Sequence, residues 1–444
     1  MGAGVCKYAN AGQLCRGGNS LQVSPIPSFH ISATSGPITW DHYLYGLLPL
    51  VNLLSTAFFL LSETSLKAGS PLAVLWTTPV IIFASLMIAW GAEAAQFFMA
   101  QGIALAVLAL LQTLPEFAVE AVLAWHQEVP YLLANLTGAL KLLTGLGWPM
   151  IYFAAARGCR RRTGKPLGRI QLDHEQSIQV VALLFSIAWQ VVIWIKRSLT
   201  VYDGVILLAI YGACLWMMRK LPPEEGETVE EIGAIPRSIV KASKPVRIAA
   251  LLALFVVGGV AVFAVAKPFL SGLFGLSAAM GVSNFIFISW VAPMISEAPE
   301  GVSAYYWARD HVRAPIALMN LVSSNINQWT LLAAMLPIVL SVSAGSITPI
   351  PLDALQSREL IMTLSQSLLG ALFLINLELA WWEATGLFVL WLLQFVLSLG
   401  PTGEIVHQAI TGVYILWCLV ELGRLITGNR KAEALGHFRR MMSR

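Results

Sequence analysis

Twelve apolar stretches dominate this sequence, and each is long enough to cross a lipid bilayer. A bilayer core of about 30 Å takes about 20 apolar residues of α-helix. The stretches fall at 43–61, 71–90, 96–125, 131–155, 177–195, 201–218, 246–266, 273–307, 314–342, 357–378, 380–398 and 407–426. Because hydrocarbon offers no partners to backbone polar groups, each stretch is expected to be helical. The predicted fold class is an all-α polytopic membrane protein with about 12 transmembrane helices.

The composition excludes several other classes of protein. Hydrophobic residues make up 57% of the chain and charged residues 12%, and the mean hydropathy is +0.72. A soluble domain would have too little polar surface at this composition, so the expected surroundings are the lipid bilayer. No phosphate loop, nucleophile elbow or HExxH motif occurs, so neither an enzyme nor an ATP-driven pump is predicted. No cofactor and no nucleic-acid partner is expected, and the oligomeric state is left open.

Basic residues orient the chain in the membrane. They gather in the loop 156–176, in the loop 219–245 and in the tail after residue 426. Lys and Arg are enriched on the cytoplasmic side, and the number of spans between these three segments is consistent with one orientation. The sequence therefore predicts an integral membrane protein with both termini in the cytoplasm.

The polar segments also divide the chain into parts. The predicted parts are a disordered cytoplasmic tail at 1–40, a first membrane half at 41–218, a cytoplasmic linker at 219–245, a second membrane half at 246–427 and a basic cytoplasmic tail at 428–444.

Two of the apolar stretches carry a proline followed by a glutamate. Pro115-Glu116 lies in QTLPEFAVE, and Pro299-Glu300 lies in WVAPMISEAPE. Proline interrupts the helical hydrogen bonds, so both helices are expected to be broken. The helix with the second motif lies five helices further along the chain than the helix with the first. Because five is an odd number, the two helices run in opposite directions. Two inverted-topology repeats, each with one broken helix, are typical of transporters that bind their substrate near the membrane midplane.

The residue types at these breaks suit a cation. Freed carbonyl oxygens and the carboxylates of Glu116 and Glu300 form an all-oxygen set, which hard cations such as Ca²⁺ prefer. We therefore predict these two glutamates as direct metal ligands. Glu120 and Glu297 share helical faces with them and are candidate ligands as well. Alternatively, these two line a water-filled vestibule or pair with Arg309.

The helix after the second break adds a polar stripe. Asn320, Ser324 and Gln328 are spaced four residues apart, with Asn325 beside them. This spacing places the first three on one helical face. They are predicted cation ligands, although polar residues of this kind also hold membrane helices together.

TLPEFAVEAV and SEAPEGVSAYYWAR, the latter followed by ALMNLVSSNINQWTLL, resemble the two alpha repeats of the calcium/cation exchanger superfamily, which includes the sodium/calcium exchangers. The corresponding segments here are about 96–155 and 273–342. The resemblance implies a secondary cation antiporter that exchanges Ca²⁺ or a related cation against H⁺ or Na⁺ by alternating access. Glu116 and Glu300 would be its central ligands. The supporting ligands implied are Thr113, Glu297, Ser324, Asn325 and Gln328.

The first repeat departs from the family pattern. The repeat asparagines of the family correspond to Asn135 and Asn320. Eight residues beyond this asparagine, the family usually has an acidic or amide ligand; the second repeat has Gln328 there, but the first has Leu143. Ala139 replaces a serine, and Lys141 adds a cation near the middle of a span. Lys141 is a possible counter-ion to Glu116 or Glu120; alternatively it snorkels or pairs elsewhere. The loss of ligands favours protons over several sodium ions as the coupling ion.

Two alternatives stay open at this point. The scaffold would carry a different solute if Lys141 and the glutamates were adapted to an organic or anionic substrate, or the protein would be a membrane scaffold that transports nothing. The remaining glutamates in or near apolar stretches are predicted to lie at the membrane interface: Glu63, Glu93, Glu378, Glu383 and Glu421.

Overall fold

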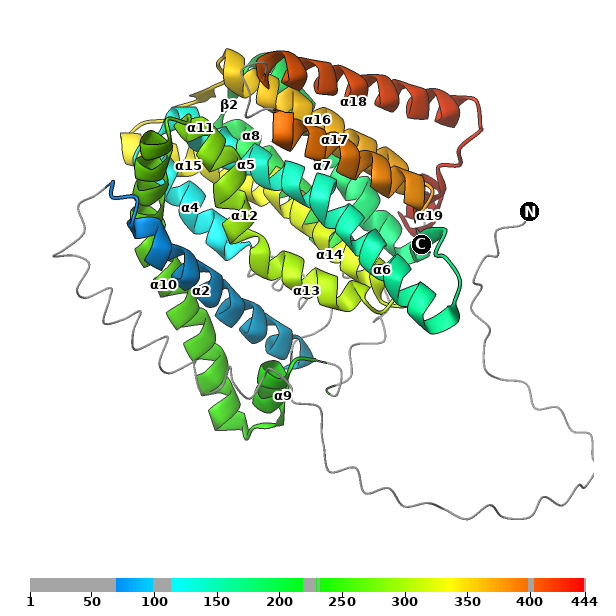
Figure 1. Ribbon diagram of the computed structural model, residues 1–444, viewed down its shortest axis with the longest axis horizontal. Coiled ribbons are helices and arrows are strands. Elements are labelled where there is room, and N and C mark those ends of the chain that lie inside the picture. Colours follow the sequence, from blue (N-terminus) through cyan, green and yellow to red (C-terminus); the bar gives the residue numbers. More distant parts are fainter. Residues whose placement is uncertain (1–68, 99–112, 219–228, 230–231, 398–402, 443–444) are drawn as a thin grey trace, which may run out of the picture. The chain divides into compact units, whose positions relative to one another are not determined.

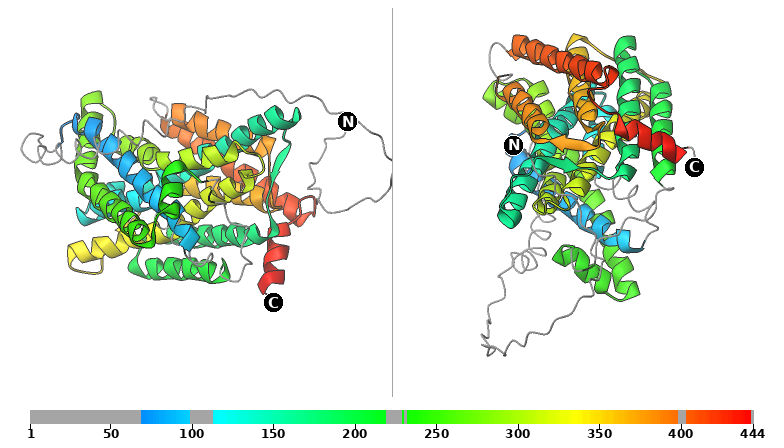
Figure 2. Two further views of the ribbon diagram at one scale, coloured as in Figure 1. Left: turned by 90° about the horizontal axis from the view of Figure 1, so that it is seen from below. Right: turned by 90° about the vertical axis from the view of Figure 1, so that its right-hand side faces the viewer.

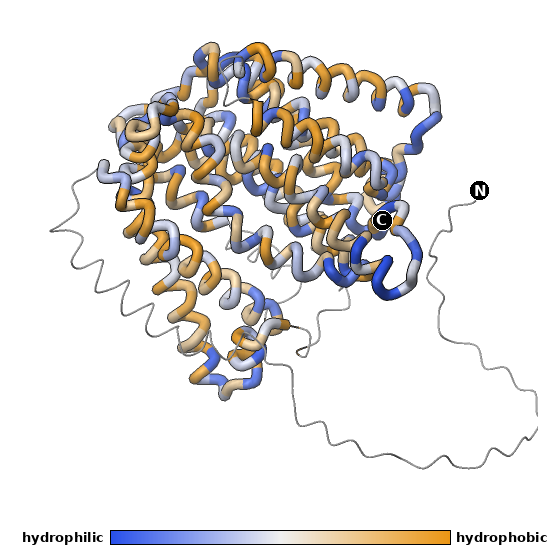
Figure 3. Tube along the Cα trace, viewed as in Figure 1, coloured by the Kyte–Doolittle hydropathy of each residue, from blue (hydrophilic) through white to orange (hydrophobic). Residues whose placement is uncertain are grey.

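The computed structural model describes residues 69–98, 113–218, 229, 232–397 and 403–442. The predicted helix at 43–61 lies outside these ranges. Within them, seven helices are long and apolar enough to cross a membrane, and two shorter apolar helices lie at Asn284–Ser296 and Trp381–Leu397. Figure 3 shows hydrophobic residues along the helices and hydrophilic residues gathered at the turn after the helix that ends at Thr163. The predicted all-α membrane class is confirmed, whereas the count of twelve spans stays a prediction.

In its described residues, the first half of the chain supplies six α-helices, which Figure 1 labels. They are α2 (Ala73–Ala95), α4 (Leu114–Trp125), α5 (Leu132–Leu142), α6 (Trp148–Thr163), α7 (Ser177–Lys196) and α8 (Val201–Met218). Short connecting elements are η1 (Gln96–Phe98), η2 (Val129–Tyr131), η3 (Leu143–Gly147), β1 (Arg169–Gln171), η4 (His174–Gln176) and β2 (Ser198–Leu199).

The second half begins after the short helix α9 (Ala234–Lys241), which lies within the predicted linker. Its helices are α10 (Lys244–Met280), α11 (Asn284–Ile286), α12 (Ala292–Ser296), α13 (Ala298–Ala308), α14 (Ala314–Asn327), α15 (Ala333–Ala344), α16 (Ala354–Leu374), α17 (Trp381–Leu397), α18 (Gly403–Ile426) and α19 (Glu433–Met442). The connecting elements are η5 (Phe287–Val291), η6 (Gln328–Leu332), β3 (Ile350–Pro351) and β4 (Glu378–Ala380).

Two small antiparallel strand pairs tie the halves together with inverted symmetry. β1 pairs with β4, and β2 pairs with β3. β1 and β3 each precede a long helix, α7 and α16, and β2 and β4 each follow that helix. The pairs therefore lie at opposite ends of α7 and α16, and each joins the start of one repeat unit to the end of the other (Figure 2). This exchange is what two repeats of opposite orientation produce.

A short sequence motif that occurs at the start of both α7 and α16 reflects the same symmetry. Leu-Asp-x-x-Gln-Ser occurs at 172–177 and again at 352–357. In both copies the aspartate side chain accepts a hydrogen bond from the backbone N–H of the glutamine three residues on, and the glutamine side chain accepts one from the aspartate N–H. This arrangement is a capping box. Further along, Arg197 and Leu377 take matching left-handed conformations, with φ of 56° and 58°. The two repeats thus share local backbone geometry as well as topology.

A π-helical segment interrupts the long helix that follows each of the two glutamate-bearing helices. The segments η3 and η6 begin at Leu143 and Gln328, the positions eight residues beyond the two repeat asparagines. Such a bulge loosens the regular ladder and is frequent at functional sites. Glutamines from the opposite repeat satisfy carbonyls beside it. Gln366 donates to the Lys141 carbonyl at 3.0 Å, and Gln190 donates to the Trp329 carbonyl at 2.8 Å.

The boundary between two predicted spans was wrong. The expected gap between 246–266 and 273–307 does not exist, because α10 continues through Pro268 to Met280, and the next helix starts at Asn284. Proline weakens a helix locally, but Phe269, Leu270 and Leu273 are fully buried on the following turns. α10 packs along α2 (Figures 1 and 2). This packing stabilises α10 on both sides of the proline.

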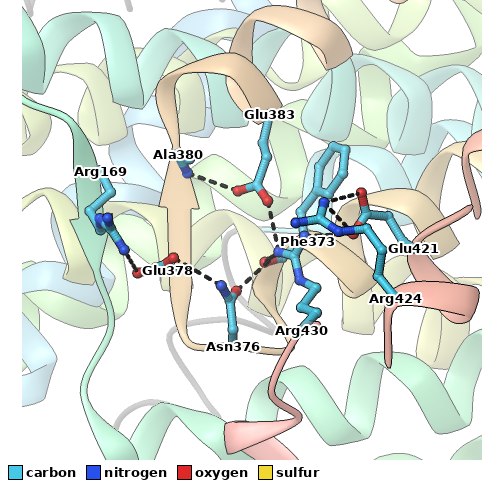
Figure 4. A network of polar contacts seen from close by, with 9 residues as sticks. All are labelled: Arg169, Phe373, Asn376, Glu378, Ala380, Glu383, Glu421, Arg424 and Arg430. Carbon is cyan, nitrogen blue, oxygen red and sulfur yellow. Dashed lines mark hydrogen bonds and ion pairs between the residues drawn. The ribbon is translucent and has the colours of Figure 1, made fainter. Parts of the chain in front are cut away.

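Two of the glutamates predicted to lie at the membrane interface belong to a buried ionic network (Figure 4). Glu383 and Glu421 are 2% and 1% exposed. Arg430 lies between them, 2.7 Å from Glu383 Oε1 and 2.8 Å from Glu421 Oε2, and it also donates to the Phe373 carbonyl at 2.6 Å. One guanidinium therefore fixes the segment after α18 against α16 and α17, since removing any partner would leave a buried charge.

Candidate cation-binding site

The second broken helix places two glutamates at a helix junction. α12 ends at Ser296 and α13 begins at Ala298, with Pro299 in its first turn. Proline has no N–H, so the carbonyl of Ile295 loses its helical donor. Glu297 occupies the N-cap position, and Glu300 lies in the first turn of α13. The predicted break at Pro299 is confirmed. Both glutamates lie at the N-terminus of α13, where negative charge is favoured.

The first repeat presents its glutamates from a corresponding helix start. α4 begins at Leu114, with Pro115 and Glu116 in its first turn and Glu120 one turn later. The residues before Thr113 lie outside the described ranges, so the predicted break here stays a prediction. Thr113 itself is buried directly before the helix. Glu116 and Glu120 are 2% and 0% exposed.

Gln328 joins the two repeats. Its amide nitrogen Nε2 donates to Glu116 Oε2 at 2.9 Å and to Glu297 Oε1 at 2.6 Å. One carboxylate comes from α4 of the first repeat and the other from the junction before α13 of the second. The side chain that sequence analysis placed at the family's ligand position therefore contacts a carboxylate of each repeat.

The remaining carboxylates continue this cluster. Glu297 lies beside Glu116, with which it shares the amide of Gln328, and Glu300 follows it by three residues. Glu300 Oε1 accepts a hydrogen bond from the Ser324 hydroxyl and a longer one, 3.4 Å, from Asn320 Nδ2. α4 and the α12–α13 junction thus bring Glu116 and Glu300 into one polar cluster.

Glu120 extends the cluster along α4 towards α5. Asn135 Nδ2 donates to Glu120 Oε1 at 3.2 Å, so the repeat asparagine of the first half also bonds a glutamate. Asn135 is a candidate ligand that sequence analysis aligned with Asn320 but left out of the predicted set. The correspondence of Asn135 to Asn320 was the sequence signal that could have predicted this role.

The four carboxylates differ from the other buried ones in what surrounds them. Within the part of the chain that the structure describes, no lysine, arginine or histidine forms an ion pair with any of them. Among the buried oxygens of the described residues that have no hydrogen-bond partner, five belong to this cluster: Glu116 Oε1, Glu120 Oε2, Glu297 Oε2, Asn135 Oδ1 and Gln328 Oε1. Buried acceptors normally have partners, so this cluster has unused capacity for a proton or a cation.

The described residues do not close this cluster into a ready-made metal site. No three Asp, Glu, His or Cys side chains among them converge closely enough to hold a metal ion by themselves. Amide and hydroxyl oxygens would therefore complete the shell of a bound cation. Ca²⁺ accepts such mixed oxygen ligands in flexible geometry.

Asn325 lies away from the carboxylates. Its Oδ1 accepts from Trp148 Nε1 at 3.1 Å, and its Nδ2 donates to Thr144 Oγ1 at 3.2 Å. It therefore holds α14 against the π-helical segment and start of α6, a role in helix packing. The other three predicted residues of α14 and η6, namely Asn320, Ser324 and Gln328, contact the glutamates.

Lys141 pairs elsewhere than with the predicted partners. Its Nζ lies 2.6 Å from Glu359 Oε2 on α16, and the structure gives it no ion pair with Glu116 or Glu120. The turn of the helix explains the difference, because Lys141 is about 240° around α5 from Asn135, which faces Glu120. The predicted counter-ion role towards Glu116 or Glu120 is therefore not supported by this arrangement. Arg309, the other alternative partner, lies over the Tyr306 ring.

Comparison with known proteins gives both a family and a fold. The family model for sodium/calcium exchanger protein matches residues 69–220 and 250–400. The crystal structure of the H⁺/Ca²⁺ exchanger CAX is 29% identical with a TM-score of 0.80, covering 90% of this chain and 98% of that one. The structure of native YfkE is 14% identical with a TM-score of 0.57, covering 83% and 99%; at this identity it shows the fold alone. No curated protein matches.

The family match covers both repeats, including α4 with Glu116 and the α12–α13 junction with Glu297 and Glu300. It agrees with the inverted strand pairing and with the shared carboxylate cluster. The chain is therefore a membrane protein of the calcium/cation exchanger superfamily and belongs to the sodium/calcium exchanger protein family.

Proposed function

We propose that this protein exchanges Ca²⁺ for protons across a membrane, with Glu116, Glu297 and Glu300 as the binding site that the two ions share. The observation that carries the proposal is a cluster of buried carboxylates from both repeats without any basic partner among the described residues. Glu120, Asn135, Ser324 and Gln328 complete the ligand set in this proposal.

Electrostatics requires a positive species at this site. Moving an isolated carboxylate out of water costs several kcal/mol or more, so buried carboxylates are protonated or bind cations. The oxygens that accept no hydrogen bond face no competing donor among the described residues. Ca²⁺ takes roughly six to eight oxygen ligands at about 2.3–2.6 Å, and carboxylate, amide and hydroxyl oxygens of this cluster are of that kind.

The contacts among the carboxyl groups favour protons as the exchanged ion. Glu297 and Glu116 share the amide of Gln328, and Glu300 follows Glu297 by three residues. Two carboxyl groups can hydrogen-bond to each other only if one of them carries a proton. A bound divalent cation would displace such protons from the same oxygens. The 29% identity to an H⁺/Ca²⁺ exchanger of known structure supports the same choice.

Inverted repeats provide the conformational change. In such folds, one repeat rocks against the other and opens the site to one side at a time. The basic loops at 156–176 and 219–245 favour an orientation with both termini in the cytoplasm. A different solute is less well supported, because the pairing of Lys141 with Glu359 removes the cation that such a substrate was expected to meet.

A flux experiment tests this proposal. The full chain is reconstituted in lipid vesicles, and ⁴⁵Ca²⁺ uptake is measured under an imposed proton gradient, an imposed Na⁺ gradient or neither. We expect uptake to follow the proton gradient and to collapse when an ionophore dissipates it. Uptake that follows only the Na⁺ gradient would overturn proton coupling, and uptake indifferent to both gradients would overturn the exchanger proposal.

A further inference from the structure

A second ionisable cluster lies apart from the four glutamates. It consists of Lys141 on α5, Glu359 on α16 and His407 on α18, and we call it the Lys-Glu-His cluster. Lys141 Nζ lies 2.6 Å from Glu359 Oε2, and His407 Nε2 lies 3.2 Å from Glu359 Oε1. The two oxygens of one carboxylate therefore face two different bases.

The three side chains differ in their access to the surroundings. The Lys141 side chain is 0% exposed, whereas those of Glu359 and His407 are 11% and 12% exposed. Lys141 and Glu359 form a pair without net charge, which is how buried ions persist. Among the three groups, the imidazole of His407 is the one that can take up a proton without first breaking this pair.

The charged groups that face Glu359 come from two other helices. Lys141 and His407 are the two that act on its carboxylate among the described residues. Arg358 and Glu404 form an ion pair between α16 and α18 at the same end of these helices. If His407 takes up a proton, two cations, its imidazolium and the Lys141 ammonium, interact with the single carboxylate of Glu359.

Lys141 connects this cluster to the second broken helix. Its Nζ lies 3.5 Å from Ser289 Oγ and 4.9 Å from the centre of the Trp290 ring. Both residues belong to η5, the segment that leads into α12 and on to Glu297. α5 also approaches η5 closely at Gly138, where a Cβ atom would lie only 1.9 Å from the Ser289 carbonyl oxygen. A shift of Lys141 would thus displace η5 and, through it, the helix that carries Glu297 and Glu300.

The inverted repeat offers an internal comparison. Gln179 occupies in α7 the place that Glu359 occupies in α16, two residues beyond the serine of the shared motif. Gln179 Nε2 donates to Ser323 Oγ of α14 at 3.0 Å. A neutral amide and a hydroxyl therefore suffice to hold the helices together in one repeat. The charged version in the other repeat adds what the neutral version lacks, a group that binds a proton.

We propose that the Lys-Glu-His cluster is a second proton-binding site, separate from the glutamate cluster, at which protonation of His407 draws Glu359 from Lys141 and moves Lys141 towards Ser289 and Trp290. Proton binding at this site does not depend on the proposed transport. Its consequence does: the site would bias the broken helix, and hence Ca²⁺ exchange, according to the pH on the side to which His407 is open.

Tryptophan fluorescence tests the proton site directly, because Trp290 lies against Lys141. The emission of the purified full chain is recorded from pH 5 to 8, and that of Trp290→Phe is subtracted to isolate Trp290. We expect one titration step in the difference. His407→Gln removes the step while the Lys141–Glu359 pair remains, and His126→Gln, at an exposed histidine after α4, retains it. Absence of the step in the wild type, or its survival in His407→Gln, would overturn the proposal.

Vesicle flux then tests the coupling to transport. The pH is varied inside and outside the vesicles in turn, and the logarithm of the Ca²⁺ uptake rate is plotted against it. We expect His407→Gln to lower the slope of this plot by about one, the contribution of one proton, on one side of the membrane. A purely structural role would lower the rate equally at every pH and would overturn the coupling. If vesicles carry no Ca²⁺ but the fluorescence step depends on His407, the proposed function fails while the proton site stands.

Discussion

Glu116→Gln and Glu300→Gln are each expected to abolish Ca²⁺ transport. Each substitution keeps the shape of the side chain and removes the negative charge that a divalent cation needs in a site of low dielectric. Losing even an indirect supporter of a metal site typically costs about 10- to 100-fold in affinity, so loss of a direct ligand is expected to cost at least about 100-fold. The measurements are ⁴⁵Ca²⁺ uptake by vesicles and calorimetric Ca²⁺ affinity of the purified protein.

A matched control separates charge from folding. Glu128→Gln makes the same substitution in the turn after α4, where Glu128 is partly exposed, and wild-type uptake is expected. The melting temperatures of all three variants should stay close to that of the wild type, because glutamine can accept the same hydrogen bonds from Gln328 and Ser324. Ca²⁺ affinity within a few-fold of wild type in Glu116→Gln would show that the two repeats do not share one site.

Glu359→Gln is expected to produce the largest loss of stability. It leaves the Lys141 ammonium, which is fully buried, without its counter-charge. Breaking a buried ion pair on one side costs about 3–5 kcal/mol, whereas replacing both partners by apolar residues is often neutral or stabilising. The measurement is the melting temperature in detergent, which should fall in Glu359→Gln and recover in the double variant Lys141→Met/Glu359→Met.

The double variant makes this prediction specific. Recovery would assign the loss to the unpaired charge, since the double variant removes even more of the native contacts. A melting temperature of Glu359→Gln equal to that of the wild type would contradict the pairing. Equal losses in the single and double variants would instead assign the effect to packing around α5 and α16.

Much of the candidate site could be predicted because its signals are local. Pro115-Glu116 and Pro299-Glu300 mark the helix starts, and the four-residue spacing of Asn320, Ser324 and Gln328 predicts the face that meets the glutamates. The structure places all three beside Glu297, Glu300 or Glu116. Such signals need only the geometry of one helix.

The rest depends on how distant helices face one another. Lys141 and Glu359 are 218 residues apart in the chain, and no local sequence signal identifies either residue as the partner of the other. The burial of Glu383 and Glu421 depends similarly on Arg430, which lies beyond the last apolar stretch. One informative signal was available, however: the repeated motif at 172–177 and 352–357 aligns the two halves, and through it Gln179 with Glu359.

The most direct test of the shared site is a count of protons released when Ca²⁺ binds. Purified protein in weakly buffered detergent solution near neutral pH is titrated with Ca²⁺ while a pH indicator reports proton release. The proximity of Glu297 to Glu116 and Glu300 predicts at least about one proton released per bound Ca²⁺, since the same oxygens hold either ion. A smaller number is expected in Glu297→Gln. Saturable Ca²⁺ binding without proton release would contradict a site for which the two ions compete.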